Sequence, residues 1–271
     1  MSRRHFTFNC RGTMLAGTLD TAPSKTGLLI VSGGNEVRSG PWSGHAQLAE
    51  RIANSGFPVM RFDRRGVGDS EGENTGFLES APDIAAALRA FRAHVPTLKS
   101  VVAYGNCDAA STLMRAHGEG CDALVLANPW TFESEEPATE EPAVVEPVRQ
   151  MTPQLLRSHY LRRLADPRAL WRLMTGKVAL DQLASSLKEA AQPAAKPTSL
   201  AEEMAAGLAV FTGPTTILIA ERDRTAQAFL SHWDKADGRL RRCPEASHSF
   251  VEPQARIWLQ GQILAALRSV A

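Results

Sequence analysis

The residues best suited to covalent chemistry in this sequence lie in a short turn around Cys107. An apolar, β-branched run that begins at Ser100 leads into Gly105-Asn106-Cys107-Asp108-Ala109, and a helix-like stretch follows. A nucleophile with small residues two positions away on each side is typical of a nucleophile elbow, a strand-to-helix turn. The strained backbone of such a turn requires small neighbours, here Gly105 and Ala109. A buried structural cysteine explains the same short string, so the motif alone does not decide.

A nucleophile in such a turn needs a base, and the base needs a carboxylate that orients it. Asp223 directly follows an apolar run that ends near Ala220, and His248 lies between a last short strand and the closing helix. The carboxyl ends of parallel strands meet at one edge of a sheet. The candidates occur in the order nucleophile, acid and base, and each follows its own predicted strand. This order predicts a catalytic triad of Cys107, Asp223 and His248.

Other residues compete for these roles. His45, at the start of a predicted helix, is a weaker rival for the base, and the other histidines lie in a predicted strand or on helices. Two arginines flank Asp223, so a surface ion pair is the alternative role for that carboxylate. Asp108 is an alternative nucleophile of the dehalogenase type. Its small neighbours would then be Asn106 and Ala110, and Asn106 fits that position badly.

The oxyanion formed during acyl transfer would need two N–H donors. One is expected from the backbone of Asp108, because the first N–H groups of a helix have no partner within it. The second is expected from the glycine-containing loop after the apolar run Thr26 to Ser32. Asn35 is the first choice for this donor and Gly34 the second, since the glycines allow close backbone approach.

Strands alternate with helices along most of the chain, which predicts the α/β class with a mainly parallel sheet flanked by helices on both faces. An antiparallel hairpin precedes this pattern. Predicted strands are His5–Arg11, Met14–Thr21, Thr26–Ser32, Phe57–Phe62, the run from Ser100, Ala123–Ala127, Thr215–Ala220 and Gly238–Cys243, and predicted helices are Ser43–Asn54, Asp83–His94, Ala109–His117, Thr225–Asp234 and Pro253–Val270.

About 80 residues separate two consecutive strands, which predicts an inserted helical lid. We expect a core of residues 1–129 and 207–271 and a lid of residues 130–206. The lid begins with a Glu/Pro-rich exposed loop, Phe132 to Val148, followed by helices over Pro153–Met174 and Val178–Ala190 and a linker over 193–198. Trp130 is expected to help set substrate choice. Arg38, beyond the oxyanion loop, is either a partner for a substrate carboxylate or a solvated side chain.

The amino-acid composition and net charge restrict the kinds of function that the sequence can have. The 271 residues are 44% hydrophobic and 22% charged with a net charge of +1, which is ordinary for a globular enzyme and gives no basis for nucleic-acid binding. No segment is apolar enough for a signal peptide or membrane insertion, so the cytoplasm is the expected location. The four cysteines form no CxxC pair, and no metal or organic cofactor is expected. Cys107 alone has a turn context that would expose it.

Several of these motifs together identify a family resemblance. The chain resembles an α/β-hydrolase with a lid, and DRRGVGDSEG matches the turn after the fourth strand of that fold. More narrowly, GNCDAAS, GGN followed by an arginine, ERDRTAQAF and SHSF resemble the exosortase A system-associated hydrolase 1 family. That resemblance implies hydrolase chemistry with a cysteine at position 107, in proteins encoded in bacterial exopolysaccharide and protein-sorting loci. It implies no particular substrate.

The expected activity is cleavage of an ester or thioester bond in a small-molecule acyl substrate, through a thioacyl-enzyme. Lactones are also candidates, because dienelactone hydrolases use a similar Cys-His-Asp set. Acyl transfer to an acceptor other than water is one alternative, since a thiolate is a good leaving group. The alternative of another class is a binding protein that kept the fold and lost turnover.

Overall fold

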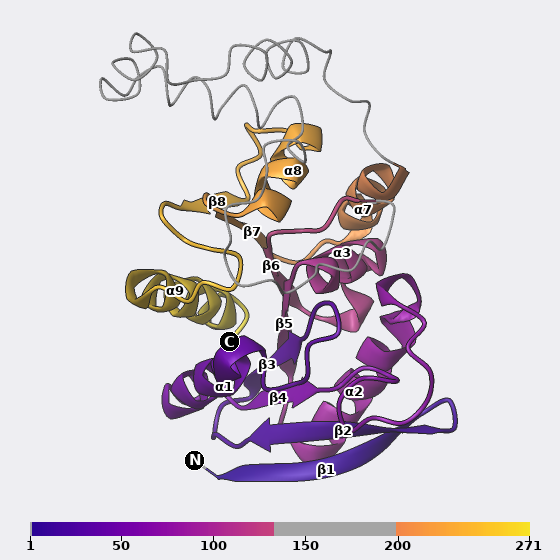
Figure 1. Cartoon of the computed structure of the whole chain (residues 1–271). Coiled ribbons are helices and arrows are strands. Elements are labelled where there is room, and N and C mark those ends of the chain that lie inside the picture. Colours follow the sequence, from indigo (N-terminus) through magenta and orange to yellow (C-terminus); the bar gives the residue numbers. More distant parts are fainter. Residues whose placement is uncertain (1, 133–198) are drawn as a thin grey trace, which may run out of the picture.

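The structure is a computed structural model that describes residues 2–132 and 199–271 (Figure 1). The described part of the chain forms one eight-stranded sheet with the order β1-β2-β4-β3-β5-β6-β7-β8. Its strands are β1 Arg3–Cys10, β2 Thr13–Asp20, β3 Thr26–Val31, β4 Val59–Phe62, β5 Ser100–Asn106, β6 Ala123–Ala127, β7 Thr215–Ala220 and β8 Leu240–Cys243. The helices are α1 Gly44–Asn54, α2 Ala81–His94, α3 Asp108–Arg115, α7 Ser199–Val210, α8 Arg224–His232 and α9 Pro253–Ser269, with short 3-10 turns at Pro41–Ser43, Phe77–Glu79 and His117–Gly120.

The sheet is parallel from β4 to β8, and β2 is antiparallel to both β1 and β4. The predicted mainly parallel sheet with an antiparallel hairpin at its start is therefore confirmed. The central strands read as continuous apolar runs because helices cover both of their faces. All six residues of β3 are buried, as that arrangement requires.

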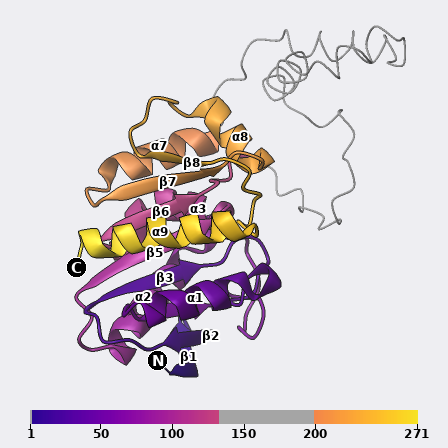
Figure 2. The same cartoon turned by 90° about the vertical axis from the view of Figure 1, so that its left-hand side faces the viewer.

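The two faces of the sheet bury separate apolar cores, and alternate residues of β3 divide between them. Leu29 and Val31 pack in the core under α2, α3, α7 and α8, whereas Leu28 and Ile30 pack under α1 and α9. Figure 2 shows α1 and α9 crossing the same face of the sheet. Because successive side chains of a strand point to opposite faces, a run of four apolar residues is what this layered arrangement demands.

The predicted lid lies almost entirely outside the described residues, including its Glu/Pro-rich loop, both helices and the linker at 193–198. The helix α7 begins at Ser199 and packs against α3 with Leu200, Met204 and Leu208 buried in the core. This contact with the core starts before the predicted boundary at residue 207. Among the described helices, none is both long and apolar enough to span a bilayer.

Two glycines lie in helices, and replacing each with alanine is expected to change the stability of the fold in opposite directions. A methyl group on Gly207 would lie 2.3 Å from the Met114 carbonyl oxygen, so Gly207 permits the close approach of α7 to α3. We expect Gly207→Ala to destabilise the fold by about 1–3 kcal/mol, because the backbone of α3 must shift. A methyl group on Gly261, in α9, meets nothing within 4 Å, and Gly261→Ala is expected to stabilise by about 0.5–1 kcal/mol. Thermal unfolding of both variants measures these changes in stability. If both substitutions shift the melting temperature in the same direction, the α7–α3 packing is contradicted.

Candidate active site

The turn between β5 and α3 has the geometry that its sequence predicts. Cys107 has φ 61° and ψ −129°, a strained conformation for a residue with a side chain, and α3 begins at the next residue. A methyl group on Gly105 would lie 2.9 Å from the backbone of Ala109 and Ala110, so only glycine fits there. Of the four cysteines, Cys107 is half-buried and the other three are buried. The turn therefore presents the Cys107 thiol at the carboxyl edge of the sheet.

The structure brings the three predicted triad residues together. His248, in the loop between β8 and α9, approaches Asp223 with 3.0 Å between its Nδ1 and the Asp223 Oδ2. Asp223 is also the N-cap of α8, where Oδ2 accepts a hydrogen bond from the Ala226 N–H at 2.9 Å. The carboxylate is thus fixed by a helix terminus as well as by the ring. On its other side, His248 lies close enough to the Cys107 thiol for each group to shift the pKa of the other.

Burial and hydrogen bonding oppose each other in this group of residues. Burial disfavours the charged ring, but the hydrogen bonds to Asp223 and Cys107 and the charges of both groups raise the pKa of His248 well above 6.5. Burial raises the pKa of the Cys107 thiol above 9.0, although the hydrogen bond with His248 and the ring's charge act in the opposite direction. Because each group shifts the pKa of the other, their protons titrate as one coupled pair.

The loop after β3 is joined to the nucleophile turn by the Asp108 side chain. Asp108 Oδ1 accepts a hydrogen bond of 2.7 Å from the Gly34 N–H, and Oδ2 lies 3.5 Å from Nη2 of the buried Arg64. Arg64 in turn donates to the Gly34 carbonyl. The second-choice oxyanion donor, the Gly34 N–H, therefore donates to a carboxylate of the protein in this structure.

The first-choice donors are placed differently. The backbone N–H of Asp108 lies at the start of α3 and lowers the pKa of the Cys107 thiol. Asn35 is exposed at the tip of the loop after β3, and its side-chain oxygen accepts a hydrogen bond from Asn74 at 2.7 Å. Within the described residues, no acceptor binds the Asn35 N–H. The Asp108 N–H borders the site, and the use of both N–H groups by an oxyanion remains a prediction.

The two predicted substrate-binding residues have structural partners. The Arg38 guanidinium forms ion pairs with Asp63 and with Asp69, the latter at 2.8 Å, and Nε donates to Thr18. Fixed in this way, Arg38 gains no support from the geometry for a role in binding a substrate carboxylate. Trp130 is partly buried, and its indole N–H donates to the Phe132 carbonyl at 2.9 Å. Its backbone N–H lies 3.3 Å from the Cys107 carbonyl oxygen, so it belongs to the rim of the site.

Two asparagines that no sequence motif marks hold the base in position. The His248 carbonyl accepts hydrogen bonds from Nδ2 of Asn106 at 3.2 Å and from Nδ2 of Asn128 at 3.0 Å. Asn128 also donates to the Asn106 side chain and accepts from the Ala220 N–H. It is fully buried at the end of β6 with φ 44°. A buried amide directly after an apolar strand was the available signal, because burying it requires hydrogen-bond partners.

The remaining rivals do not join the triad. His45 is buried at the start of α1 with Nδ1 3.5 Å from the Ser32 hydroxyl, and burial lowers its pKa to about 4. Cys10, Cys121 and Cys243 are buried, as expected of structural cysteines. Within residues 2–132 and 199–271, no three or more His, Cys, Asp and Glu side chains cluster as a metal site would need.

Known structures share this fold over nearly the whole chain at low sequence identity. The alpha/beta hydrolase GrgF from Penicillium sp. sh18 is 16% identical with a TM-score of 0.64, covering 99% of this chain and 99% of that one. The esterase Pf2001 from Pyrococcus furiosus is 14% identical with a TM-score of 0.60, covering 99% and 91%. XC6422 from Xanthomonas campestris, an α/β serine hydrolase without a lid, is 15% identical with a TM-score of 0.58, covering 99% and 95%. At such identities these similarities establish the fold alone.

No curated protein sequence matches the chain. The family model of the alpha/beta hydrolase family matches residues 28–257, which include the β5–α3 turn, Asp223 and His248. The match extends over most of the described sheet and both of its helical layers. The chain therefore belongs to the alpha/beta hydrolase family.

Proposed function

We propose that the chain is a cysteine-nucleophile hydrolase that cleaves an ester or thioester bond through a thioacyl-enzyme. The observation that carries the proposal is the connected arrangement of Cys107, His248 and Asp223 at a strained strand-to-helix turn. A structural cysteine needs neither the strained backbone nor the oriented imidazole. Esterases among proteins of the same fold support the same reaction class.

In the proposed reaction, Nε2 of His248 takes the Cys107 proton as the sulfur attacks the substrate carbonyl carbon and a C–S bond forms. The tetrahedral intermediate collapses, the C–O or C–S bond to the leaving group breaks, and the imidazolium returns its proton to the leaving group. Water then attacks the thioacyl carbon, giving its proton to His248. The C–S bond to Cys107 breaks, the thiol is restored and the acid departs.

The N–H groups of Asp108 and Asn35 are proposed to bind the developing oxyanion. Preorganised N–H donors aimed at that charge are the usual source of much of the rate enhancement in acyl transfer. The negative charge of the Asp108 carboxylate opposes an oxyanion nearby, so its hydrogen bond to Gly34 and its proximity to Arg64 are important. They orient the carboxylate toward the loop after β3 and place a positive charge beside it.

The narrower family, the cellular location, the lid boundaries and the role of Trp130 are part of the same proposal. We place the chain in the exosortase A system-associated hydrolase 1 family, linked to bacterial exopolysaccharide loci, on the motifs around Cys107, Asp223 and His248. A reducing, cytoplasmic location fits four cysteines that are all free thiols. The lid boundaries at 130 and 206 and the role of Trp130 in substrate choice belong to the proposal as well.

A panel of p-nitrophenyl esters, acyl thioesters and lactones tests the reaction class, with mass spectrometry of enzyme stopped during turnover. We expect an acyl adduct on the peptide that contains Cys107, and release of free acid. Release of the acyl group only to an added alcohol or amine would favour acyl transfer. Absence of both turnover and adduct across the panel would favour the binding-protein alternative.

The rate of alkylation by iodoacetamide should depend on pH in a way that reports the coupled pair. Below its pKa the His248 ring is already protonated and cannot accept the thiol proton, so alkylation of Cys107 should be slow at pH 6. The rate should rise with a midpoint above 6.5, because the pKa of His248 is raised. In His248→Ala the rise should move to higher pH than in the unmodified protein, because the ring that opposes the effect of burial on the thiol is then lost. Peptide mapping identifies the labelled cysteine, and equal rates at Cys107 and the buried Cys121 would contradict an activated thiol.

A further inference from the structure

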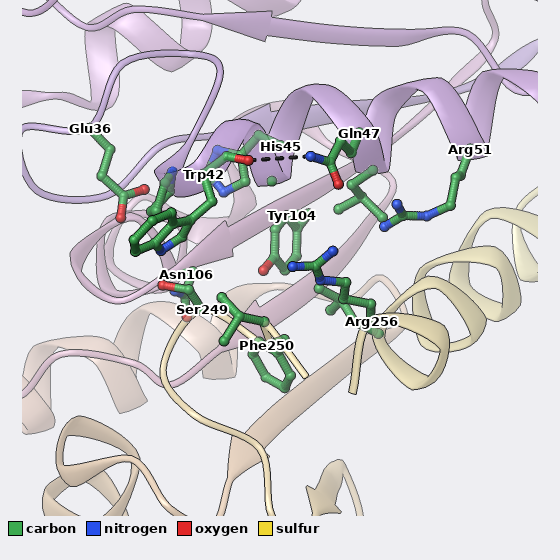
Figure 3. A pocket seen from close by; sticks show the side chains of 15 residues that line it. Glu36, Trp42, His45, Gln47, Arg51, Tyr104, Asn106, Ser249, Phe250 and Arg256 are labelled. Atoms are coloured by element: carbon green, nitrogen blue, oxygen red, sulfur yellow. Dashed lines mark hydrogen bonds between the residues drawn. The ribbon is translucent and has the colours of Figure 1, made fainter. Parts of the chain in front are cut away.

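A polar pocket adjoins the active site on the side of the sheet covered by α1 and α9 (Figure 3). Asn106 and Ser249, the chain neighbours of Cys107 and His248, line it together with Arg51 of α1 and Arg256 of α9. Cys107 and His248 themselves do not line it. The pocket therefore extends sideways from the reacting groups toward the space between two helices.

The two arginines place unneutralised positive charge at one end of this pocket. Figure 3 shows both guanidinium groups directed into the pocket, on the side away from Asn106. Arg51 donates through Nε to the Gln260 side chain at 3.0 Å, which fixes its orientation, and neither arginine forms an ion pair within the described residues. Burial and the nearby charge of Arg256 both lower the pKa of Arg51. Two guanidinium groups that repel each other gain from an anion bound between them.

Tyr104 places a hydroxyl donor on the wall of the same pocket. Its side chain is 2% exposed, so the ring is held in the core. Burial raises the pKa of Tyr104, with a further contribution from the Glu36 charge, so the hydroxyl remains a neutral donor. A neutral hydroxyl on the pocket wall can donate a hydrogen bond to a ligand oxygen there.

The distribution of charge along the pocket also orients a ligand. Glu36, which lines the pocket, lies at the opposite end from Arg51 in Figure 3. His45, on the wall, is uncharged at neutral pH because burial lowers its pKa to about 4. An anionic group is therefore repelled from the end near Glu36 and attracted to the end formed by Arg51 and Arg256.

We propose that Arg51, Arg256 and Tyr104 form a binding site for a carboxylate or phosphate group carried by the substrate. The substrate's scissile bond would lie at Cys107 and its anionic end between α1 and α9. This substrate class rests on the proposed hydrolase function, whereas binding of the anion itself does not. Guanidinium groups suit both anions because they donate paired hydrogen bonds to carboxylate and phosphate oxygens.

Isothermal titration at low ionic strength with benzoate, phenyl phosphate and neutral benzamide tests the site without requiring turnover. We expect one or both anions to bind the full chain, and benzamide to bind at least about tenfold more weakly, because hydrogen bonds to charged groups are the stronger ones. Whichever of benzoate and phenyl phosphate binds with the lower Kd shows whether the site prefers a carboxylate or a phosphate group. Arg51→Gln and Arg256→Gln should each weaken the bound anion several-fold, and the double variant about tenfold or more.

Arg268→Gln is the matched control, because Arg268 lies on the same helix α9 but does not line the pocket. It should bind the anion as the unmodified protein does. Melting temperatures of all variants exclude unfolding as the cause of lost binding. An unchanged Kd in the double variant, or benzamide binding as tightly as the anions, would overturn the anion site.

Kinetics then test the substrate class with two esters of equal acyl length. Mono-4-nitrophenyl adipate carries a terminal carboxylate that 4-nitrophenyl hexanoate lacks. The ratio of their kcat/KM values should fall about tenfold or more in the double arginine variant, mainly through KM, and should be retained in Arg268→Gln. No hydrolysis of any ester would refute the proposed function while the titration still decides the anion site. Hydrolysis with an unchanged ratio would refute an acyl-side carboxylate as the bound group.

Discussion

Replacing Cys107 with alanine is expected to lower kcat for ester or thioester hydrolysis by at least about 10³-fold, because the covalent step loses its nucleophile. The substitution removes only the sulfur atom and keeps the β-carbon in the strained turn, so the fold should be retained. Steady-state hydrolysis of the best substrate from the ester and thioester panel measures the effect. The thioacyl adduct should also disappear from the mass spectrum.

A matched control distinguishes loss of the nucleophile from loss of any thiol. Cys243, at the end of β8, is 5% exposed, and within the described residues no hydrogen bond joins it to His248 or Asp223. Cys243→Ala should therefore keep the kcat of the unmodified protein, with at most a small loss of stability. If Cys107→Ala turns over at the unmodified rate, the thioacyl mechanism is wrong.

The sequence was sufficient to predict the sheet, and to predict which residues meet at its carboxyl edge, for a common physical reason. Strands buried on both faces appear as uninterrupted apolar runs, such as that of β3, and the residues that follow them gather at one edge. Cys107 and Asp223 follow such strands, β5 and β7, whereas His248 lies in the loop after β8, a short edge strand with exposed arginines. Their meeting is thus a consequence of topology, which hydrophobic patterning specifies well.

The contacts that support the triad were not predictable in the same way. The hydrogen bonds from Asn106 and Asn128 to the His248 carbonyl join residues far apart in sequence, and no periodic pattern marks them. The Asp108 side chain was considered only as a nucleophile, yet it binds the Gly34 N–H. Such contacts depend on side-chain directions at strand ends, which the apolar pattern leaves unspecified.

The contrast between Arg38 and the Arg51–Arg256 pair illustrates this limit. Arg38 lies near the predicted oxyanion loop in sequence, which allows either binding of a substrate carboxylate or a solvated side chain. In the folded chain Asp63 and Asp69 neutralise it. The pair formed by Arg51 and Arg256 arises only when α1 and α9 pack on the same face of the sheet. Free positive charge beside the site is therefore a property of tertiary structure.

Replacing Asp223 with asparagine is expected to lower kcat by about 10³–10⁴-fold while leaving stability nearly unchanged. Asparagine can still cap α8 through its side-chain oxygen, which now accepts the Ala226 N–H hydrogen bond. It lacks the negative charge that helps to raise the pKa of His248, so that pKa should fall. The residual activity should therefore reach its acidic half-maximum at a lower pH than in the unmodified protein.

Two further variants separate the role of the Asp223 charge from its role as a cap. Asp223→Ala loses both, so it should lose activity to a similar extent and also about 1 kcal/mol of stability. Asp237→Asn removes a carboxylate that pairs with Arg239 away from the triad, and it should keep full activity. Stopped assays across pH 5–9 with parallel thermal unfolding provide both readouts. An Asp223→Asn variant with unaltered kcat and pH profile would show that His248 acts without an orienting carboxylate, because the variant keeps the cap and lacks only the charge.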